Sequence, residues 1–304
     1  MAAAAVTPAL LSVRKAVADL LAGAQAVVAC SGGADSLALA AAAATLPQPI
    51  TAVVVDHGLQ PDSAAVAAEA AAQCQKLGLD TETRRVTVDG PGGPEAAARA
   101  ARYAALREIA SGRPILLAHT LDDQAETVLL RLARGSGARS LSAMSPVDAD
   151  LYRPLLGLRR SLVRQACTEA GLTAHEDPHN ADDRYARARL RHHGLPALVE
   201  DLGDAVVLGL ARSATALRED NAALDAWAAE VTSTQASDLA ALPRAVRLRV
   251  VRRMALAAGC PGSALTREHL TTVAGLVEDW RGQGPIDLPG GVRAARESGR
   301  LVLQ

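Results

Sequence analysis

Residues 31–36, SGGADS, follow a β-prone run (25–30, QAVVAC) and precede a helix-forming run (37–41, LALAA). A strand-to-helix turn leaves backbone N–H groups unpaired at a helix N-terminus, where the helix dipole favours an anion. Gly32 and Gly33 let the backbone approach a ligand closely, and the hydroxyls of Ser31 and Ser36 add donors. The turn is therefore predicted to bind phosphate. The alternative is a tight turn whose Asp35 or Ser36 only caps the helix.

The turn lacks both the Gly-Lys-[Ser/Thr] ending of a Walker loop and the G-x-G-x-x-G spacing of a dinucleotide-binding fold. It resembles instead the pyrophosphate loop (PP-loop), S-G-G-x-D-S, of ATP pyrophosphatases, which split ATP into AMP and pyrophosphate. The resemblance implies that the whole turn contacts ATP, through Ser31, Gly32, Gly33, Ala34, Asp35 and Ser36.

Strand-like and helix-like runs alternate from about residue 25 to residue 120. Strands are expected at 26–30, 51–56, 83–88 and 115–119, and helices at 36–44, 63–77 and 95–110. Such alternation predicts an α/β fold with a doubly wound, Rossmann-like parallel sheet that binds ligands at the carboxyl ends of its strands. Candidate chemistry follows every strand: the SGGADS turn, Asp56-His57, the turn at 88–90, and His119. We therefore expect Asp56, His57 and His119 at the nucleotide site, with each histidine either catalytic or only a hydrogen-bonded strand end.

The length of 304 residues, of which 49% are hydrophobic, suggests two domains. Beyond Pro196 the β-prone runs stop, and helices are expected at 197–229, 242–258 and 266–281, with a small closing hairpin formed by 285–291 and 301–303. We expect a catalytic domain at 1–195 and a smaller, mainly helical domain at 196–304. Trp227 and Trp280 have apolar neighbours, which favours core positions over base-stacking ones.

The composition limits the function classes. Cys30, Cys74, Cys167 and Cys260 are scattered without a C-x-x-C pair, so they are expected to be core residues in a reducing compartment and not ligands of zinc or an iron–sulfur cluster. The N-terminus lacks a basic segment before an apolar one, and the apolar run 38–44 is too short to span a bilayer. We expect a cytoplasmic protein without a membrane partner.

Positive charge is concentrated locally, although the formal net charge is only −1. Four of the eight residues at 184–191 are arginine, and Arg247, Arg249, Arg252 and Arg253 form a second cluster. Any RNA binding is therefore expected to depend on local patches.

Asp123 and Glu126 lie three residues apart at the start of an expected helix, 122–133, so they share one helical face. Two like charges there repel unless a cation lies between them, and Mg²⁺ or an ammonium ion would relieve the repulsion. The alternative is simple helix capping, with Thr120 or Asp122 as the cap.

The order of motifs resembles that of tRNA(Ile)-lysidine synthetases over residues 25–196. The shared segments are SGGADS at 31–36, VDHGL at 55–59, ARAARY at 98–103, AHTLDDQAETVLLRLARGSG at 118–137, YRPLL at 152–156 and EDPHNADDRY at 176–185. One departure is Ala188, where the family usually has asparagine, so a contact made by that amide is missing or supplied elsewhere. The chain resembles the short form of the family, without the further C-terminal domain of longer members.

This resemblance implies an ATP-dependent tRNA-modifying ligase that acts on the wobble cytidine of tRNA(Ile) with a CAU anticodon. The cytosine O2 would attack the ATP α-phosphate, and free L-lysine would then displace AMP to give lysidine. Asp35 would hold Mg²⁺ or reach the lysine, and Asp123 and Glu126 would receive the lysine ammonium. Phosphate or tRNA contacts are expected from Arg99, Arg102, Arg187, Arg189 and Arg191, with Asn180, Asp182 and Tyr185 shaping the preceding loop. The oligomeric state stays open, with a homodimer as one alternative.

Three other function classes fit parts of the pattern. A tRNA thiolation enzyme would need cysteine pairs, which the sequence does not offer. A small-molecule ligase of the NAD-synthetase or GMP-synthetase type would need neither the arginines at 184–191 nor a helical domain. A nucleotide-binding sensor would have no need for Asp35, Asp123 and Glu126 beside phosphates.

Overall fold

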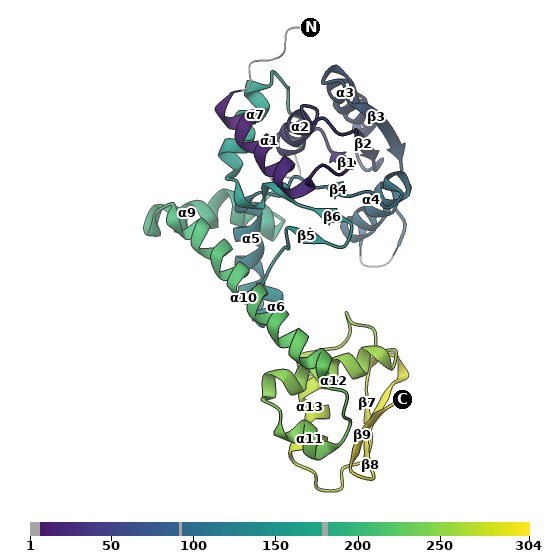
Figure 1. The fold of residues 1–304 in the computed structure, drawn as a ribbon. Helices are drawn as coiled ribbons and strands as arrows, with labels where there is room; N and C mark the ends of the chain where they lie inside the picture. The colour runs from purple at the N-terminus through teal and green to yellow at the C-terminus, as the bar shows by residue number, and fades with distance from the viewer. Residues whose placement is uncertain (1–6, 91–92, 178–181) are drawn as a thin grey trace. The chain divides into compact units, whose positions relative to one another are not determined.

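The computed structural model describes residues 7–90, 93–177 and 182–304, and the chain forms two compact units, Met1–Ala214 and Thr215–Gln304 (Figure 1). The division lies inside helix α10 (Ala205–Glu230) and not at the expected position near residue 195. Leu195, Val207 and Ala211 pack against Leu121 and Ala125 in a separate apolar cluster. This packing joins α9 (Leu195–Leu202) and the first turns of α10 to the first unit.

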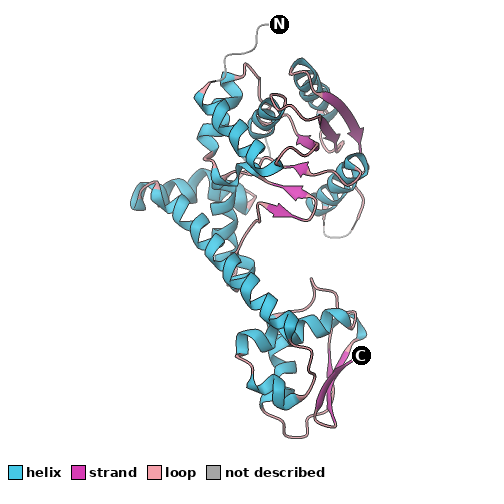
Figure 2. Cartoon of the chain, in the orientation of Figure 1, coloured by secondary structure: helices cyan, strands magenta, loops and turns pink. Residues whose placement is uncertain are grey.

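The first unit is built on a six-stranded sheet, whose strands are magenta in Figure 2 and are labelled in Figure 1; their order is β3-β2-β1-β4-β6-β5. All neighbouring strands are parallel except β5 and β6. The carboxyl ends of β2, β1, β4 and β6 therefore lie at one edge. The strands are β1 (Ala26–Cys30), β2 (Ile50–Asp56), β3 (Asp80–Arg85), β4 (Ile115–Leu116), β5 (Val147–Asp148) and β6 (Leu151–Tyr152).

Helices cover both faces of this sheet, which confirms the doubly wound α/β fold. One face carries α1, α2, α3 and α7 over a core that includes Val28, Leu39 and Val163, and the other carries α4 over Val27, Val53 and Leu106. The helices of the first unit outside α9 and α10 are α1 (Pro8–Leu21), α2 (Ala34–Ala43), α3 (Ser63–Lys76), α4 (Pro94–Ala110), α5 (Leu121–Leu132), α6 (Ala138–Leu141), α7 (Arg160–Glu169) and α8 (Ala186–Arg189).

The expected strand 83–88 is wrong in its position, because β3 runs from Asp80 to Arg85. This strand pairs only with β2 and leaves its polar side chains half-buried or exposed, so apolar periodicity could not locate it. β4 is shorter than expected. The sequence did not indicate α1, β5 or β6, although α1 buries Leu10, Val13 and Val17.

The second unit packs α11 (Ala236–Ala241), α12 (Arg244–Ala257) and α13 (Arg267–Glu278) with an antiparallel sheet. The expected closing hairpin is a three-stranded sheet in the order β7-β8-β9: β7 (Ile286–Asp287), β8 (Arg293–Glu297) and β9 (Arg300–Leu303). Its core includes Leu239, Val250, Leu276 and Leu301.

The expectation that both tryptophans are core residues is wrong. Trp227 and Trp280 are 46% and 40% exposed, because the helical neighbours of Trp227 turn inward in its place and Trp280 lies beyond the end of α13. Three arginines of the cluster on α12, Arg247, Arg249 and Arg253, bind groups within the second unit. Arg247 is buried and binds the carbonyls of residues 239, 240 and 242 together with Glu278, while Arg249 pairs with Asp225.

All four cysteines are buried free thiols, as expected of core residues. In the part of the chain that the structure describes, no helix is both long and apolar enough to cross a membrane.

Candidate functional site

The SGGADS turn lies between β1 and α2, as its sequence context predicted. Gly32 has a φ of +82°, and a Cβ there would lie 3.3 Å from the Cβ of Ala70, so both the conformation and the space favour glycine. The Ser36 hydroxyl donates to the Gly33 carbonyl at 2.9 Å and accepts from the Ser31 N–H at 3.1 Å. Helix α2 begins at Ala34 after an N-cap glycine. Because Gly33 has no side chain to accept from the first N–H groups, this helix end is suited to an anion.

Asp35 lies in the first turn of α2. Burial and the negative charge of Asp123 raise the pKa of Asp35 to about 6. Its Oδ1 is buried and has no hydrogen-bond partner among the described residues, while Oδ2 lies 3.9 Å from Nε of Arg160. Asp35 therefore has a carboxylate oxygen available for a cation.

Helix α5 starts with a capping box formed by Thr120 and Asp123. The Asp123 Oδ2 accepts from the Thr120 N–H at 2.8 Å and from its hydroxyl at 2.7 Å, and the Asp123 N–H donates to the Thr120 hydroxyl at 3.4 Å. Thr120 is thus the cap, but Asp123 uses only one of its oxygens in this role. Its Oδ1 remains for other contacts.

Three arginines converge on Asp123 and Glu126. The Asp123 Oδ1 accepts from Arg160 at 2.9 Å and from Arg187 and Arg191 at 3.0 Å each. Glu126, which is 0% exposed, accepts from the same three guanidinium groups at 2.9 Å. The cations that separate the two acids in this structure are therefore the chain's own arginines, three guanidinium groups on two carboxylates.

These contacts keep both acids ionised. Burial disfavours the charge of Asp123, but Arg160 and Arg187 outweigh it and hold the pKa of Asp123 well below its usual range. Burial likewise opposes the charge of Glu126, but the hydrogen bond from Arg191 and the charge of Arg160 lower its pKa. Burial disfavours the charge of Arg160 too, yet Asp123 and Glu126 raise its pKa above the usual value.

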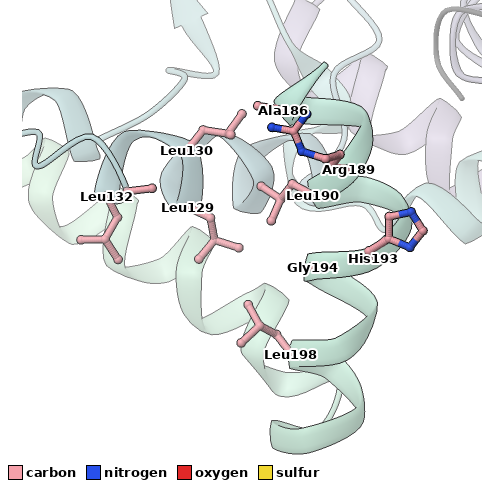
Figure 3. A pocket seen from close by; sticks show the side chains of 10 residues that line it. Leu129, Leu130, Leu132, Ala186, Arg189, Leu190, His193, Gly194 and Leu198 are labelled. Carbon is pink, nitrogen blue, oxygen red and sulfur yellow. The ribbon is translucent and has the colours of Figure 1, made fainter. Parts of the chain in front are cut away.

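The basic segment 184–191 presents two faces. Arg187 and Arg191, four residues apart, contact the acids, whereas Arg189 donates to the backbone carbonyls of Asp183 and Arg184. Arg189 also lines an apolar groove of about 620 Å³ with Leu129, Leu190 and His193 (Figure 3). Ala188 is buried, so the departure from the family pattern lies inside the protein. Asn180 lies outside the described residues.

Asp56 ends β2, and His57 and His119 follow the ends of β2 and β4 at the same edge of the sheet. Asp56 accepts from the Gly58 N–H at 2.9 Å, which stabilises the turn. Burial and the charge of Arg102 lower the pKa of His57, and burial lowers the pKa of His119 to about 4. Both imidazoles are therefore neutral at pH 7, and each has a buried Nδ1 without a hydrogen-bond partner among the described residues.

Arg99 and Arg102 do not join the acid cluster. Their guanidinium carbons lie 4.9 and 5.3 Å from the centre of the Tyr103 ring on the same helix, α4. Tyr103 itself is buried. Its ring therefore fixes the two arginines near the sheet edge by cation–π contact.

Sequence reasoning missed Arg160 and Arg153. Arg160 begins α7 just after the edge strands and links Asp35 to Asp123 and Glu126. Arg153 directly follows β6, is 6% exposed and donates to the Ser145 carbonyl at 2.8 Å. The sequence did carry a signal for both arginines. They lie in the stretch 152–160, YRPLLGLRR, which follows the region of the acids and precedes a helix.

The donor set at Asp35 suits Mg²⁺ that is shared with phosphate oxygens. Within residues 7–90, 93–177 and 182–304, no group of three or more His, Cys, Asp or Glu side chains could hold a metal by itself. Mg²⁺ commonly uses one or two carboxylates together with substrate phosphates, and the unpartnered Asp35 Oδ1 beside the phosphate turn fits that pattern.

Comparison with known proteins gives a consistent result. Residues 9–198 match the PP-loop domain family, and residues 235–302 match the TilS substrate binding domain. The tRNA(Ile)-lysidine synthase of Thermobifida fusca (strain YX) is 50% identical over 308 residues, which cover 96% of this chain and 95% of that protein. The enzyme of the same name from Mycolicibacterium paratuberculosis is 55% identical over 289 residues, covering 91% and 89%.

Among solved structures, the U34-tRNA thiolase NcsA from Methanococcus maripaludis with its [4Fe-4S] cluster matches with a TM-score of 0.57. The sequences are 17% identical, and the match covers 69% of this chain and 80% of that one. At this identity the likeness concerns the fold alone.

Proposed function

The chain belongs to the tRNA(Ile)-lysidine synthase family, and from this membership we propose how its own residues carry out lysidine formation. The enzyme is a ligase that uses ATP to modify the wobble cytidine, C34, of tRNA(Ile) with a CAU anticodon. Arg160 is the observation that carries our proposal, because its side chain joins Asp35 of the phosphate turn to Asp123 and Glu126. The two half-reactions would therefore take place at adjoining sites.

The first half-reaction uses the phosphate turn. The cytosine O2 attacks the ATP α-phosphate and pyrophosphate leaves, while backbone N–H groups of Gly32, Gly33 and Ala34 face the departing negative charge. The Ser31 hydroxyl adds a donor, and the Ser36 hydroxyl, which donates to the Gly33 carbonyl in this structure, would turn to the phosphate when ATP binds. Asp35 would hold Mg²⁺, which supplies charge neutralisation of the phosphates.

The second half-reaction uses the acids. Asp123 and Glu126 would receive the ε-ammonium or α-ammonium of free L-lysine, and the other amine, once deprotonated, attacks C2 of the cytosine and expels AMP. Their ionised state supports this role, because a charged carboxylate binds an ammonium group. The ammonium would take over contacts that the three arginines make in this structure.

The tRNA would be held by arginines of the first unit and by the second unit. Arg187, Arg189 and Arg191 are our candidates for phosphate contacts near the reacting base, with Arg99 and Arg102 as further candidates. The match of residues 235–302 to a substrate-binding domain supports tRNA binding by the second unit. The substrates proposed here (tRNA, ATP and lysine) are found together in the cytoplasm, which supports a cytoplasmic enzyme.

The decisive experiment incubates the protein with ATP, labelled lysine and CAU-anticodon tRNA(Ile). We expect the label in RNA, with AMP and pyrophosphate released together. A matched tRNA(Ile) whose wobble base is uridine is the control and should stay unlabelled. Release of ADP, or label-free RNA with consumed ATP, would reject the proposal.

A further inference from the structure

A second group of polar side chains lies at the carboxyl edge of the sheet, and none of its members belongs to the phosphate turn or to the pair of acids. Arg153 follows β6, and His57 and His119 follow β2 and β4 in the same parallel sheet. Helix α4 begins after the carboxyl end of β3, and Arg102 and Tyr103 lie at its middle, where the charge of Arg102 reaches His57 and Tyr103 interacts with Arg153. The topology therefore brings five polar residues from four segments together.

Each of these five residues has a buried polar atom without a hydrogen-bond partner among the described residues. Nε of Arg102, the Tyr103 hydroxyl and Nε of Arg153 are buried without a hydrogen-bond partner among the described residues, as is Nδ1 of both histidines. Arg153 and Tyr103 are only 6% and 8% exposed as whole residues. Because buried polar atoms nearly always have partners in folded proteins, such a concentration indicates a site built for a ligand.

The charge of the group identifies the kind of ligand. Arg99, Arg102 and Arg107 all lie over the Tyr103 ring, but Arg107 is neutralised by Asp150 at 2.7 Å. Among the described residues, the one acidic partner of Arg153 is the exposed Asp148, at the long distance of 3.8 Å. The charges of Arg102 and Asp56 reach His57, and those of Asp123, Arg153, Arg187 and Arg99 reach His119, so arginines outnumber acids around the pair. The group is thus rich in donors and net positive, which suits an anion.

We infer that Arg102, Tyr103 and Arg153 form a phosphate-binding site, in which Tyr103 and Arg153 are binding residues in addition to Arg102. The guanidinium Nε–H groups and the phenol hydroxyl donate to the phosphate oxygens. The phosphate belongs either to ATP or to the RNA backbone beside the reacting base, and this choice of ligands rests on the proposed function. The shared chemistry is a phosphate held by two guanidinium groups and a hydroxyl.

The test compares Arg102→Gln and Tyr103→Phe with the wild type in two binding titrations, one with ATP alone and one with the CAU anticodon stem-loop alone. Arg107→Gln is the matched control, because Arg107 lies over the same ring but is paired with Asp150. We expect Arg102→Gln to weaken one of the two ligands about ten- to a hundredfold and Tyr103→Phe about two- to tenfold. Arg107→Gln should leave both affinities unchanged.

A loss confined to ATP assigns the site to the nucleotide, and a loss confined to RNA assigns it to the backbone phosphate. Wild-type affinity of both folded variants for both ligands overturns the inference. If Arg102→Gln does not fold, Tyr103→Phe decides alone, since it removes one hydroxyl and no charge. Lysidine formation by the wild type is scored separately, so a failure of the proposed function is distinguishable from a failure of this site.

Discussion

Nη2 of Arg160, on helix α7, lies 2.9 Å from Oε1 of Glu126, on helix α5. The Glu126 side chain has no solvent exposure. Arg160 also approaches Asp35 in the phosphate turn, so one guanidinium group contacts both the nucleotide side and the acid side of the site. Breaking a buried ion pair by removing one partner is costly, because the other charge is left uncompensated. Substitutions at these positions therefore need a stability measurement beside each kinetic one.

Glu126→Gln is expected to separate the two half-reactions. The substitution keeps the volume but removes the charge and one of the two acceptor oxygens, and a charge-assisted contact contributes about 1.5–3 kcal/mol. We expect the lysine KM to rise about ten- to a hundredfold while pyrophosphate release with tRNA continues. The exposed Glu108→Gln, which alters only a pair with Arg84, is the control. A mutant that instead loses ATP cleavage would mean that the acids serve Mg²⁺.

Asp35→Ala should abolish tRNA-dependent ATP–pyrophosphate exchange and leave tRNA affinity nearly intact. Asp35 lies inside the phosphate turn and not among the arginines of 184–191, so the nucleotide step alone depends on it. Isotope exchange and a filter-binding titration measure the two properties. The exposed Asp19→Ala is the control, and normal exchange in Asp35→Ala would remove this residue from the catalytic set.

Arg189→Ala and Arg187→Ala should differ, although both residues belong to one basic segment. Arg189 contacts no acid of the site, so its loss should weaken tRNA binding and reduce the slope of log K against log salt by about 0.7–0.9. Arg187→Ala should also change the lysine KM, because Arg187 contacts Asp123 and Glu126. Salt titrations and lysine kinetics on both variants decide this. An unchanged salt slope in Arg189→Ala would mean that Arg189 makes no contact with tRNA phosphates and only packs within the protein.

Gly32→Ala and Gly33→Ala are a matched pair that separates backbone strain from ligand approach. Gly32 has a positive φ and a close neighbour in Ala70, so alanine there should lower the free energy of unfolding by about 1–2 kcal/mol. Gly33 has a φ of −74° and ordinary contact distances, so alanine there should fold normally and weaken only ATP binding. Thermal unfolding with and without ATP measures both. Equal loss of stability in the two variants would contradict the view that only Gly32 is required by the backbone conformation.

His119 should make the protein less stable in acid. Its pKa is about 4 in the folded state against 6.5 for the ordinary side chain, so the unfolded chain takes up the proton first as the pH falls. The free energy of unfolding should therefore drop as the pH falls from 6.5 towards 4, by about 2 kcal/mol at pH 5 from this group. Denaturant titrations at pH 7.5 and 5 should show a smaller drop for His119→Asn, whereas the exposed His193→Asn keeps the wild-type drop.

The sequence predicted those parts of the fold whose pattern is local. β1 has the predicted bounds, α3 and α4 differ from prediction by one residue at one end, and Thr120 caps α5. β3 was misplaced because an edge strand buries little, and its polar side chains carry no apolar alternation.

The site was predictable only where residue types cluster along the chain. Asp123 and Glu126 share a helical face that spacing reveals, but their partner Arg160 comes from another helix more than thirty residues away. The exposed tryptophans show the same limit, because apolar neighbours do not determine which side of a helix faces the core. Contacts between distant segments depend on packing that no single stretch encodes.

Since Asp123 and Glu126 already have three counterions, the arrival of an ammonium group would be an ion exchange and not the filling of a bare negative site. The cluster of three arginines and two acids already carries a net positive charge, so long-range attraction contributes little to the affinity for a further cation. Selection among cationic amino acids then depends on chain length and fit. A competitor with the same charge but a shorter or longer side chain should be rejected at any ionic strength.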